Sequence, residues 1–221
     1  MDDYHYDPSV LPRMVAISQR QRAKDSIFIT ALIPYFRTGP ILEIGAGCGQ
    51  LSELLAATGL DITPSDVQPF FVDYMLQRGL AARVIDATLL PSGLDRAYDN
   101  ILAQSISVLI TPDLAIVRRT YEAVHSALPD DGRFIFILPS GWGERWSHAA
   151  DHVRLADQAG FDLVHRFRHQ VFPSSVYGRL PASLLRAADG SFGRIFGVRW
   201  VFIFRRRDSP TGQAAQPGPA A

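Results

Sequence analysis

The sequence contains one cysteine, Cys48, among 221 residues. A single cysteine can form no disulfide within the chain and can supply no cysteine cluster for zinc. The formal net charge is zero, with 22 basic and 22 acidic residues, whereas proteins that grip nucleic acid usually carry a basic excess. Arg205-Arg206-Arg207 is locally basic, and we interpret it as a solvated strand end. We therefore expect neither a metal site nor a nucleic-acid partner.

Long hydrophobic runs are also missing, and none approaches the length of a membrane span. The first residues, Met1-Asp2-Asp3, lack the basic and apolar regions of a signal peptide. Hydrophobic residues make up 47% of the chain and charged residues 20%, which is typical of a globular protein. A chain of this length suits one domain with a well-buried core. These features predict a cytoplasmic protein without membrane contact.

Glycine is concentrated where the chain reads PILEIGAGCGQ, at residues 40–50. A short apolar run containing the acid Glu43 is followed by Gly45, Gly47 and Gly49, and then by helical spacing. This pattern predicts a strand, a tight loop and a helix. Glycine suits such a loop because it adopts backbone angles closed to other residues and lets a ligand approach the main chain. The free N–H groups at the start of the helix can bind polar or anionic ligand groups.

The glycine spacing separates two classes of ligand. A dinucleotide-binding loop has the pattern G-x-G-x-x-G, but Gln50 stands where that pattern has its last glycine. With Glu43 included, the stretch reads E-x-G-x-G-x-G, which resembles motif I of the class I S-adenosylmethionine-dependent methyltransferases. The resemblance covers about residues 40–207. Two alternatives remain: a nucleotide-binding oxidoreductase on a similar sheet, and a non-catalytic module that binds the same cofactor.

Strands and helices alternate along the chain. We expect strands at about 41–44, 61–65, 82–85, 98–103, 133–138, 162–172 and 197–206, and helices at about 50–58, 69–78, 112–128, 149–159 and 182–188. Thr111 should cap the helix that begins at Pro112, and 9–36 should be helical with a break. This alternation predicts a parallel sheet covered on both faces. Ligands of such sheets bind beyond the carboxyl ends of the strands.

The resemblance implies a more detailed fold. It is an α/β, three-layer Rossmann-like sandwich with a mostly parallel seven-stranded sheet in the order 3-2-1-4-5-7-6, whose last strand in sequence is antiparallel. We divide the chain into an N-terminal helical cap segment (1–39), an S-adenosylmethionine-binding methyltransferase domain (40–207) and a disordered tail (208–221) rich in Ser, Pro, Gly, Gln and Ala.

Acidic residues follow two predicted strands. Asp66 should end the second strand, where a carboxylate can accept hydrogen bonds from both hydroxyls of a ribose, although this also fits a nicotinamide cofactor. Its rival Asp61 begins the strand and should lie at the wrong edge, and Asp66 could instead cap the next helix. Asp86 follows the third strand, where it can accept from an exocyclic amine while the N–H of Ala87 reaches a ring nitrogen.

The resemblance turns these placements into roles in binding S-adenosylmethionine. It implies that Asp66 binds the ribose, that Asp86-Ala87 recognises adenine, and that Glu43 lies near the methionine end. Gln104 should face the same cavity, unless it is an exposed loop amide. The residues expected to bind the cofactor are Glu43, Gly45, Ala46, Gly47, Gly49, Asp66, Val67, Asp86, Ala87 and Gln104.

The methyl acceptor is predicted to be a small molecule with a nucleophilic oxygen or nitrogen. Residues 104–107 read QSIS and lack the Asn-Pro-Pro-Tyr motif of many DNA and protein amide methyltransferases. The acceptor is expected at 140–152 and 173–196, in a monomer or homodimer. His148 is our candidate for a general base, and substrate contacts are expected from Tyr6, Trp142, Trp146, His152 and Tyr177.

Each acceptor residue also has a simpler interpretation. His148 and His152 could be exposed polar residues of a helix, and the tryptophans could merely cover the sheet. His165 and His169 are expected to face outward from their strand.

Overall fold

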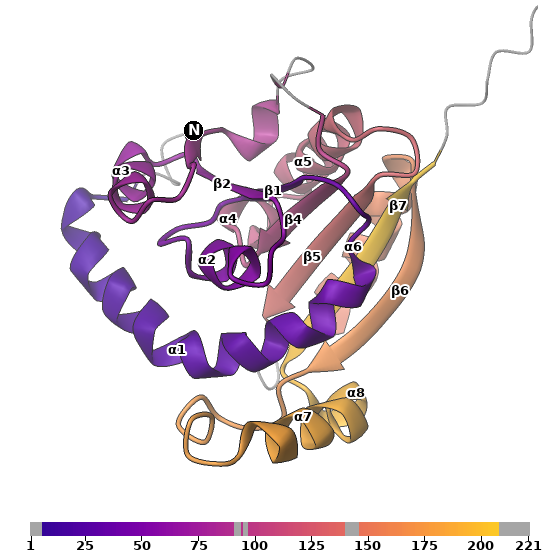
Figure 1. Cartoon of the computed structure of the whole chain (residues 1–221). Coiled ribbons are helices and arrows are strands. Elements are labelled where there is room, and N and C mark those ends of the chain that lie inside the picture. Colours follow the sequence, from indigo (N-terminus) through magenta and orange to yellow (C-terminus); the bar gives the residue numbers. More distant parts are fainter. Residues whose placement is uncertain (1–5, 91–93, 95–96, 140–145, 208–221) are drawn as a thin grey trace, which may run out of the picture.

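A seven-stranded sheet forms the centre of the protein (Figure 1). The structure is a computed structural model that describes residues 6–90, 94, 97–139 and 146–207. The strands are β1 (Ile41–Ile44), β2 (Ile62–Asp66), β3 (Arg83–Val84), β4 (Asn100–Gln104), β5 (Arg133–Pro139), β6 (Phe161–His169) and β7 (Arg199–Arg206). Their order is β3-β2-β1-β4-β5-β7-β6, as predicted. The strands from β3 to β5 pair in parallel, while β7 is antiparallel to both β5 and β6.

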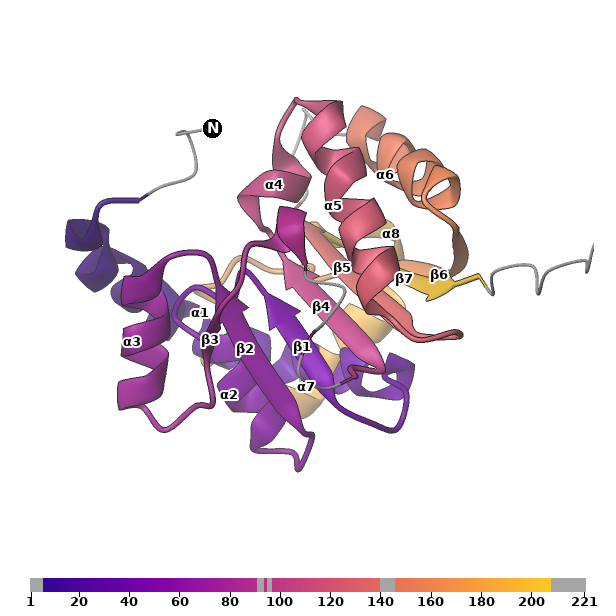
Figure 2. The same ribbon diagram turned by 90° about the horizontal axis from the view of Figure 1, so that it is seen from above.

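Helices cover both faces of this sheet (Figure 2). They are α1 (Leu11–Leu32), α2 (Gln50–Ala56), α3 (Pro69–Gln77), α4 (Ser107–Ile110), α5 (Leu114–Ala127), α6 (Trp146–Gln158), α7 (Ala182–Ser191) and α8 (Gly193–Phe196). Short 3-10 turns lie at η1 (Pro8–Val10), η2 (Ile33–Tyr35) and η3 (Ala87–Leu89). None of the helices in the described part of the chain combines the length and hydropathy that a membrane span requires.

The sheet separates two hydrophobic clusters. On one face, α5 and α6 pack on an aromatic cluster formed by Tyr121, Phe134, Phe136, His152, Phe161, Phe202 and Phe204. On the other face, α1 and α2 pack on mostly aliphatic residues of β1, β4, β5 and β7. Successive residues of β5 therefore enter different clusters, which explains its nearly unbroken apolar sequence.

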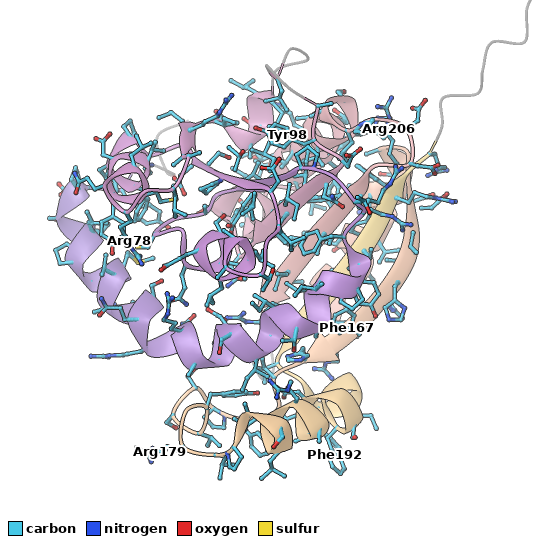
Figure 3. All side chains as sticks on the ribbon, viewed as in Figure 1. Arg78, Tyr98, Phe167, Arg179, Phe192 and Arg206 are labelled. Carbon is cyan, nitrogen blue, oxygen red and sulfur yellow. The ribbon has the colours of Figure 1, made fainter. Side chains whose placement is uncertain are left out.

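The N-terminal helix differs from its prediction. We expected a break between 9 and 36, but α1 is one continuous helix of 22 residues. Residues 19–25 of α1 read QRQRAKD and form a polar turn. This turn is held by a chain of ion pairs: Glu53 of α2 binds both Arg22 of α1, at 3.0 Å, and Arg78 near the end of α3 (labelled in Figure 3). These ion pairs link α1 to α2 and to the end of α3.

The predicted start of α5 was wrong. Thr111 has extended backbone angles and Pro112 precedes the helix, which begins at Leu114. The carboxylate of Asp113 accepts hydrogen bonds from the N–H groups of Ala115 and Ile116 and so caps the helix instead. A carboxylate is favoured at this position because it also interacts with the positive end of the helix dipole.

Pro64 does not disturb the sheet. It lies in the interior of β2, opposite Glu43 of β1. β3 pairs only with Ser65 and Asp66, so β2 has a single neighbour at Pro64 and the missing N–H can face its open side. The strand therefore continues to Asp66, as the sequence predicted.

Candidate functional site

A cavity of about 300 Å³ lies at the carboxyl ends of β1, β2 and β4. Figure 2 shows the arrowheads of these strands pointing to one edge of the sheet. The walls are formed by the glycine loop after β1, the ends of β2 and β4, the segment after β3 and residues 14–25 of α1. The lining of the cavity includes most of the residues predicted for the site: Glu43, Gly45, Ala46, Gly47, Asp66, Val67, Asp86, Ala87, Gln104 and Tyr6.

The three glycines of the loop have positive φ angles, at 68°, 55° and 71°, in the region that glycine adopts without a steric penalty. A Cβ on Gly45 would lie 2.1 Å from Ile106, and one on Gly49 would lie 2.7 Å from the sulfur of Met75. A Cβ on Gly47 would meet no protein atom within 4 Å. Gly49 does not line the cavity and serves close packing against α3. Gly47 leaves open space beside the cavity.

Asp66 connects the end of β2 to the glycine loop. Its Oδ2 accepts a hydrogen bond from the N–H of Gly47 and its Oδ1 one from the N–H of Gln68, each at 2.9 Å. Burial raises the pKa of Asp66, against the effect of these hydrogen bonds. The residue thus lines the cavity and also binds the turn before α3. Asp61 is exposed and lies before β2, outside the cavity.

Glu43 is the most deeply buried acid of the cavity, with 2% of its surface exposed. The hydroxyl of Ser52 donates a hydrogen bond to its carboxylate. Burial raises the pKa of Glu43 to about 7, and the nearby charges of Asp66 and Asp25 add to this, while the Ser52 hydrogen bonds oppose it. Close by in the same cavity, the side-chain oxygen of Gln104 is buried without a hydrogen-bond donor. This end of the cavity therefore has acceptors available to a ligand that carries donors.

Asp86 and Ala87 lie where adenine recognition was predicted, in the cavity wall after β3. Asp86 Oδ1 accepts hydrogen bonds from the backbone N–H and the hydroxyl of Thr88, both at 2.8 Å. These bonds hold the carboxylate at the start of η3.

Sequence reasoning missed the contribution of α1. Five residues of this helix line the cavity: Met14, Ile17, Ser18, Gln21 and Asp25. Asp25 is only 3% exposed. The sole signal in the sequence was its position at the edge of a polar turn, which a solvated helix face would produce equally well.

Two predicted acceptor residues lie away from the cavity. His152 is in the aromatic cluster, with its Nδ1 at 3.1 Å from the hydroxyl of Tyr121 and its ring 4.7 Å from that of Phe136. Tyr177 is buried beside Leu185 and donates to the carboxylate of Asp189 at 2.9 Å. Both are held by internal partners, so the structure does not bring them to the predicted site.

The remaining histidine and tryptophan predictions have different outcomes. His165 is exposed, as expected, but His169 is buried against Phe28 on α1, with ring centroids 5.0 Å apart. It does not face outward because α1 covers this end of β6. Trp142 lies outside the described residues. Trp146 and His148 belong to α6, but their side chains are also outside the described part.

Comparisons with known proteins agree with this architecture. No family model and no curated protein matches the chain. A TehB-like SAM-dependent methyltransferase from Corynebacterium glutamicum has a similar structure, with a TM-score of 0.62 and 19% identity over 91% of this chain and 100% of that one. The CcbJ methyltransferase from Streptomyces caelestis has a TM-score of 0.61, with 14% identity over 85% of this chain and 90% of that one.

The glycopeptide N-methyltransferase MtfA in complex with S-adenosylmethionine is also similar, with a TM-score of 0.60 and 16% identity over 85% of this chain and 94% of that one. Identities this low show the fold alone. The protein has the fold of the class I S-adenosylmethionine-dependent methyltransferases, as motif I predicted.

Proposed function

We propose that the protein is a class I methyltransferase that transfers a methyl group from S-adenosylmethionine to an oxygen or nitrogen of a small molecule. The observation that carries this proposal is the cavity in which Glu43, the glycine loop and Asp66 meet at the carboxyl edge of the sheet. The similar structures include a glycopeptide N-methyltransferase, which supports a small-molecule acceptor. We further propose that the protein acts in the cytoplasm as a monomer or homodimer, without nucleic acid or membrane.

The polar groups of the cavity fit this cofactor. Four carboxyl groups line it, on Asp25, Glu43, Asp66 and Asp86, and the described lining residues include no Lys, Arg or His. S-adenosylmethionine brings a positively charged sulfonium, a positively charged ammonium group, one carboxylate and two ribose hydroxyls, and so carries one net positive charge. A nicotinamide dinucleotide would bring a doubly charged pyrophosphate next to these carboxylates. Like charges at short distance are unfavourable, so the cavity favours the first ligand.

The chain itself contributes mainly orientation. When bound, the cofactor supplies a methyl group on a positively charged sulfur, which becomes a neutral thioether when the acceptor takes the methyl. Holding two reactants in line can lower a barrier by about 7–11 kcal/mol. Ile106 after β4 and Met14 and Ile17 on α1 line the same cavity, where apolar side chains exclude water. Tyr6, Trp142 and Trp146 are proposed acceptor contacts, and His148 remains the proposed base.

The glycine loop offers a direct test of the cofactor. Gly47→Val should abolish binding of S-adenosylhomocysteine, measured by calorimetry, because its side chain would extend into space that no protein atom occupies. Gly59→Val is a matched control, since Gly59 also has a positive φ, at 89°, and no atom within 4 Å of an added Cβ, but lies outside the cavity. Both variants bear similar backbone strain.

The outcomes separate the two cofactor classes. The wild type should bind S-adenosylmethionine and S-adenosylhomocysteine, and the Gly59 variant should bind them with unchanged affinity. Binding of a nicotinamide dinucleotide without binding of either sulfur compound would refute the proposal. Intact binding by a folded Gly47→Val protein would refute the position of the ligand.

A further inference from the structure

Asp25 is a buried carboxylate on the N-terminal helix that the motif does not include. Its Oδ2 accepts a hydrogen bond from the side-chain amide of Gln50 at 2.8 Å, and its Oδ1 accepts one from the guanidinium of Arg199 at 3.1 Å. Asp25 and Gln50 both line the cavity, whereas Arg199 lies outside its lining. Two partners thus hold the carboxylate in one orientation at the cavity wall.

This carboxylate lies close to Glu43. The charge of Asp25 raises the pKa of Glu43, together with burial and the charge of Asp66. Glu43 has the hydroxyl of Ser52 as its hydrogen-bond donor, while Asp25 is paired with Arg199. The buried side-chain oxygen of Gln104 has no donor, and the carboxylates of Glu43 and Asp25 can each accept further hydrogen bonds, so the cavity has acceptors available here. A ligand group with several N–H donors and a positive charge would satisfy them.

We propose that Asp25 is a further cofactor-binding residue, which together with Glu43 accepts the α-ammonium group of the methionine moiety. The inference rests on the proposed function, and it assigns to α1 a part in binding the cofactor. An ammonium group has three donors and can therefore contact Glu43 and Asp25 at once. Gln50 acquires a role as well: it replaces the last glycine of a dinucleotide loop and orients Asp25 from the start of α2.

The test uses two ligands that differ only in the ammonium group. They are S-adenosylhomocysteine and its deaminated analogue, S-adenosyl-4-thiobutyrate, with dissociation constants measured by calorimetry. Asp25→Asn should weaken binding of S-adenosylhomocysteine at least tenfold, which corresponds to about 1.4 kcal/mol. It should change the affinity for the analogue less than about threefold. The ratio of the two affinities therefore reports on the contact between Asp25 and the ammonium group.

Asp189→Asn is the matched control. Asp189 is as deeply buried and accepts hydrogen bonds from Tyr177 and from the N–H of Val171, but it lies outside the cavity. Its substitution should leave the affinity ratio unchanged even if the protein loses stability. If Asp25→Asn does not fold, Gln50→Met is the second variant, because it removes the donor that orients Asp25. It should reduce the preference for S-adenosylhomocysteine over the analogue.

Other outcomes overturn the inference. Equal losses for both ligands in Asp25→Asn would mean that Asp25 only supports the glycine loop. Unchanged binding of S-adenosylhomocysteine would mean that the carboxylate does not reach the ligand. In both cases the proposed function would stand, because the wild type would still bind the cofactor. A wild type that binds neither ligand would overturn the proposed function together with this inference.

Discussion

The cavity and the aromatic cluster both bury polar groups, but in different ways. In the aromatic cluster the hydroxyl of Tyr121 and the Nδ1 of His152 bind each other at 3.1 Å, among packed phenylalanine rings. Around the cavity the carboxyl groups of Asp25, Glu43 and Asp66 are buried, and Gln104 has an acceptor without a donor. One region satisfies its polar groups internally, and the other leaves acceptors for a ligand.

The difference separates polar groups that the fold itself satisfies from acceptors that we propose for a ligand. Burying a polar group costs free energy unless it is hydrogen-bonded, and burying a charge costs more. Acceptors without donors are therefore expected only where a ligand supplies the donors. By this criterion His152 is a structural residue, whereas Gln104, which lines the same cavity as Glu43, has an acceptor that we propose for a ligand. The residue type alone does not separate them.

The largest effect is expected in the aromatic cluster. Phe136 is fully buried and packs against His152 and Phe202, with ring centroids at 4.7 and 6.1 Å. Phe136→Ala should lower the free energy of unfolding by about 3–5 kcal/mol, because it removes a large side chain and leaves a cavity. Urea denaturation measures this loss. Phe192→Ala is the control, since Phe192 is 58% exposed at the outer side of α7 and α8 (Figure 3). A comparable loss in the control would contradict the conclusion that the aromatic cluster stabilises the fold.

Glu43→Gln should stabilise the protein relative to the wild type as the pH rises, whereas Phe136→Ala destabilises it. The pKa of Glu43 is raised from 4.5 to about 7, so the folded protein holds a proton that the unfolded chain loses above pH 4.5. Its contribution to stability is full below pH 4.5 and disappears as the pH rises through 7. Between pH 5 and 8 the wild type should therefore lose about 2–3 kcal/mol relative to the variant.

Denaturation of both proteins at several pH values, without ligand, measures this difference. The variant should also bind S-adenosylhomocysteine more weakly at pH 8, since it offers no carboxylate to the ammonium group. Parallel pH profiles for the two proteins would mean that Glu43 is satisfied within the protein, as His152 is.

Asp66→Ala tests the other end of the cavity. Loss of hydrogen bonds to two ribose hydroxyls should weaken binding of S-adenosylhomocysteine at least tenfold, or about 1.4 kcal/mol. Asp61→Ala, at an exposed position before β2, should change binding little. Calorimetry on variants of matched thermal stability compares the two. A larger loss of affinity in Asp61→Ala than in Asp66→Ala would mean that Asp66 does not belong to the site.

The smallest effect is expected for the polar pair in the aromatic cluster. Tyr121→Phe removes the hydroxyl that binds His152 and should lower the free energy of unfolding by about 1 kcal/mol. Affinity for S-adenosylhomocysteine should not change, because neither residue lines the cavity. A loss of affinity with unchanged stability would place this pair in the functional site.

Local patterns in the sequence were enough to predict much of the fold. The alternation of strands and helices predicted the parallel part of the sheet, and the E-x-G-x-G-x-G pattern predicted the loop, while the observed strand order was implied only by the family resemblance. The placement of Asp66 rather than Asp61 at the strand end was also correct. These features could be predicted because each depends on neighbours in the chain: apolar periodicity determines which face is buried, and only glycine adopts positive φ without a penalty.

The start of α5 was mispredicted even though its signals were local. Thr111, Pro112 and Asp113 can each begin a helix, and their intrinsic preferences are similar. The choice depended on the short helix α4 just before them, which ends at Ile110 and leaves Thr111 extended. Similar preferences allow a neighbouring element to decide a boundary.

The sequence by itself determined the sheet, the glycine loop and the cofactor class that they predict. Only the tertiary structure decided which polar side chains are buried, and with what partners. Asp25 meets Gln50 across 25 residues of sequence and Arg199 across 174. Likewise, Phe28 of α1 packs against His169, although the two residues are far apart in the sequence. A polar residue is tolerated in the interior when a partner satisfies it. Because that partner lies far away in the sequence, local periodicity describes Asp25 as a solvated residue, and only the folded chain places it in the cavity.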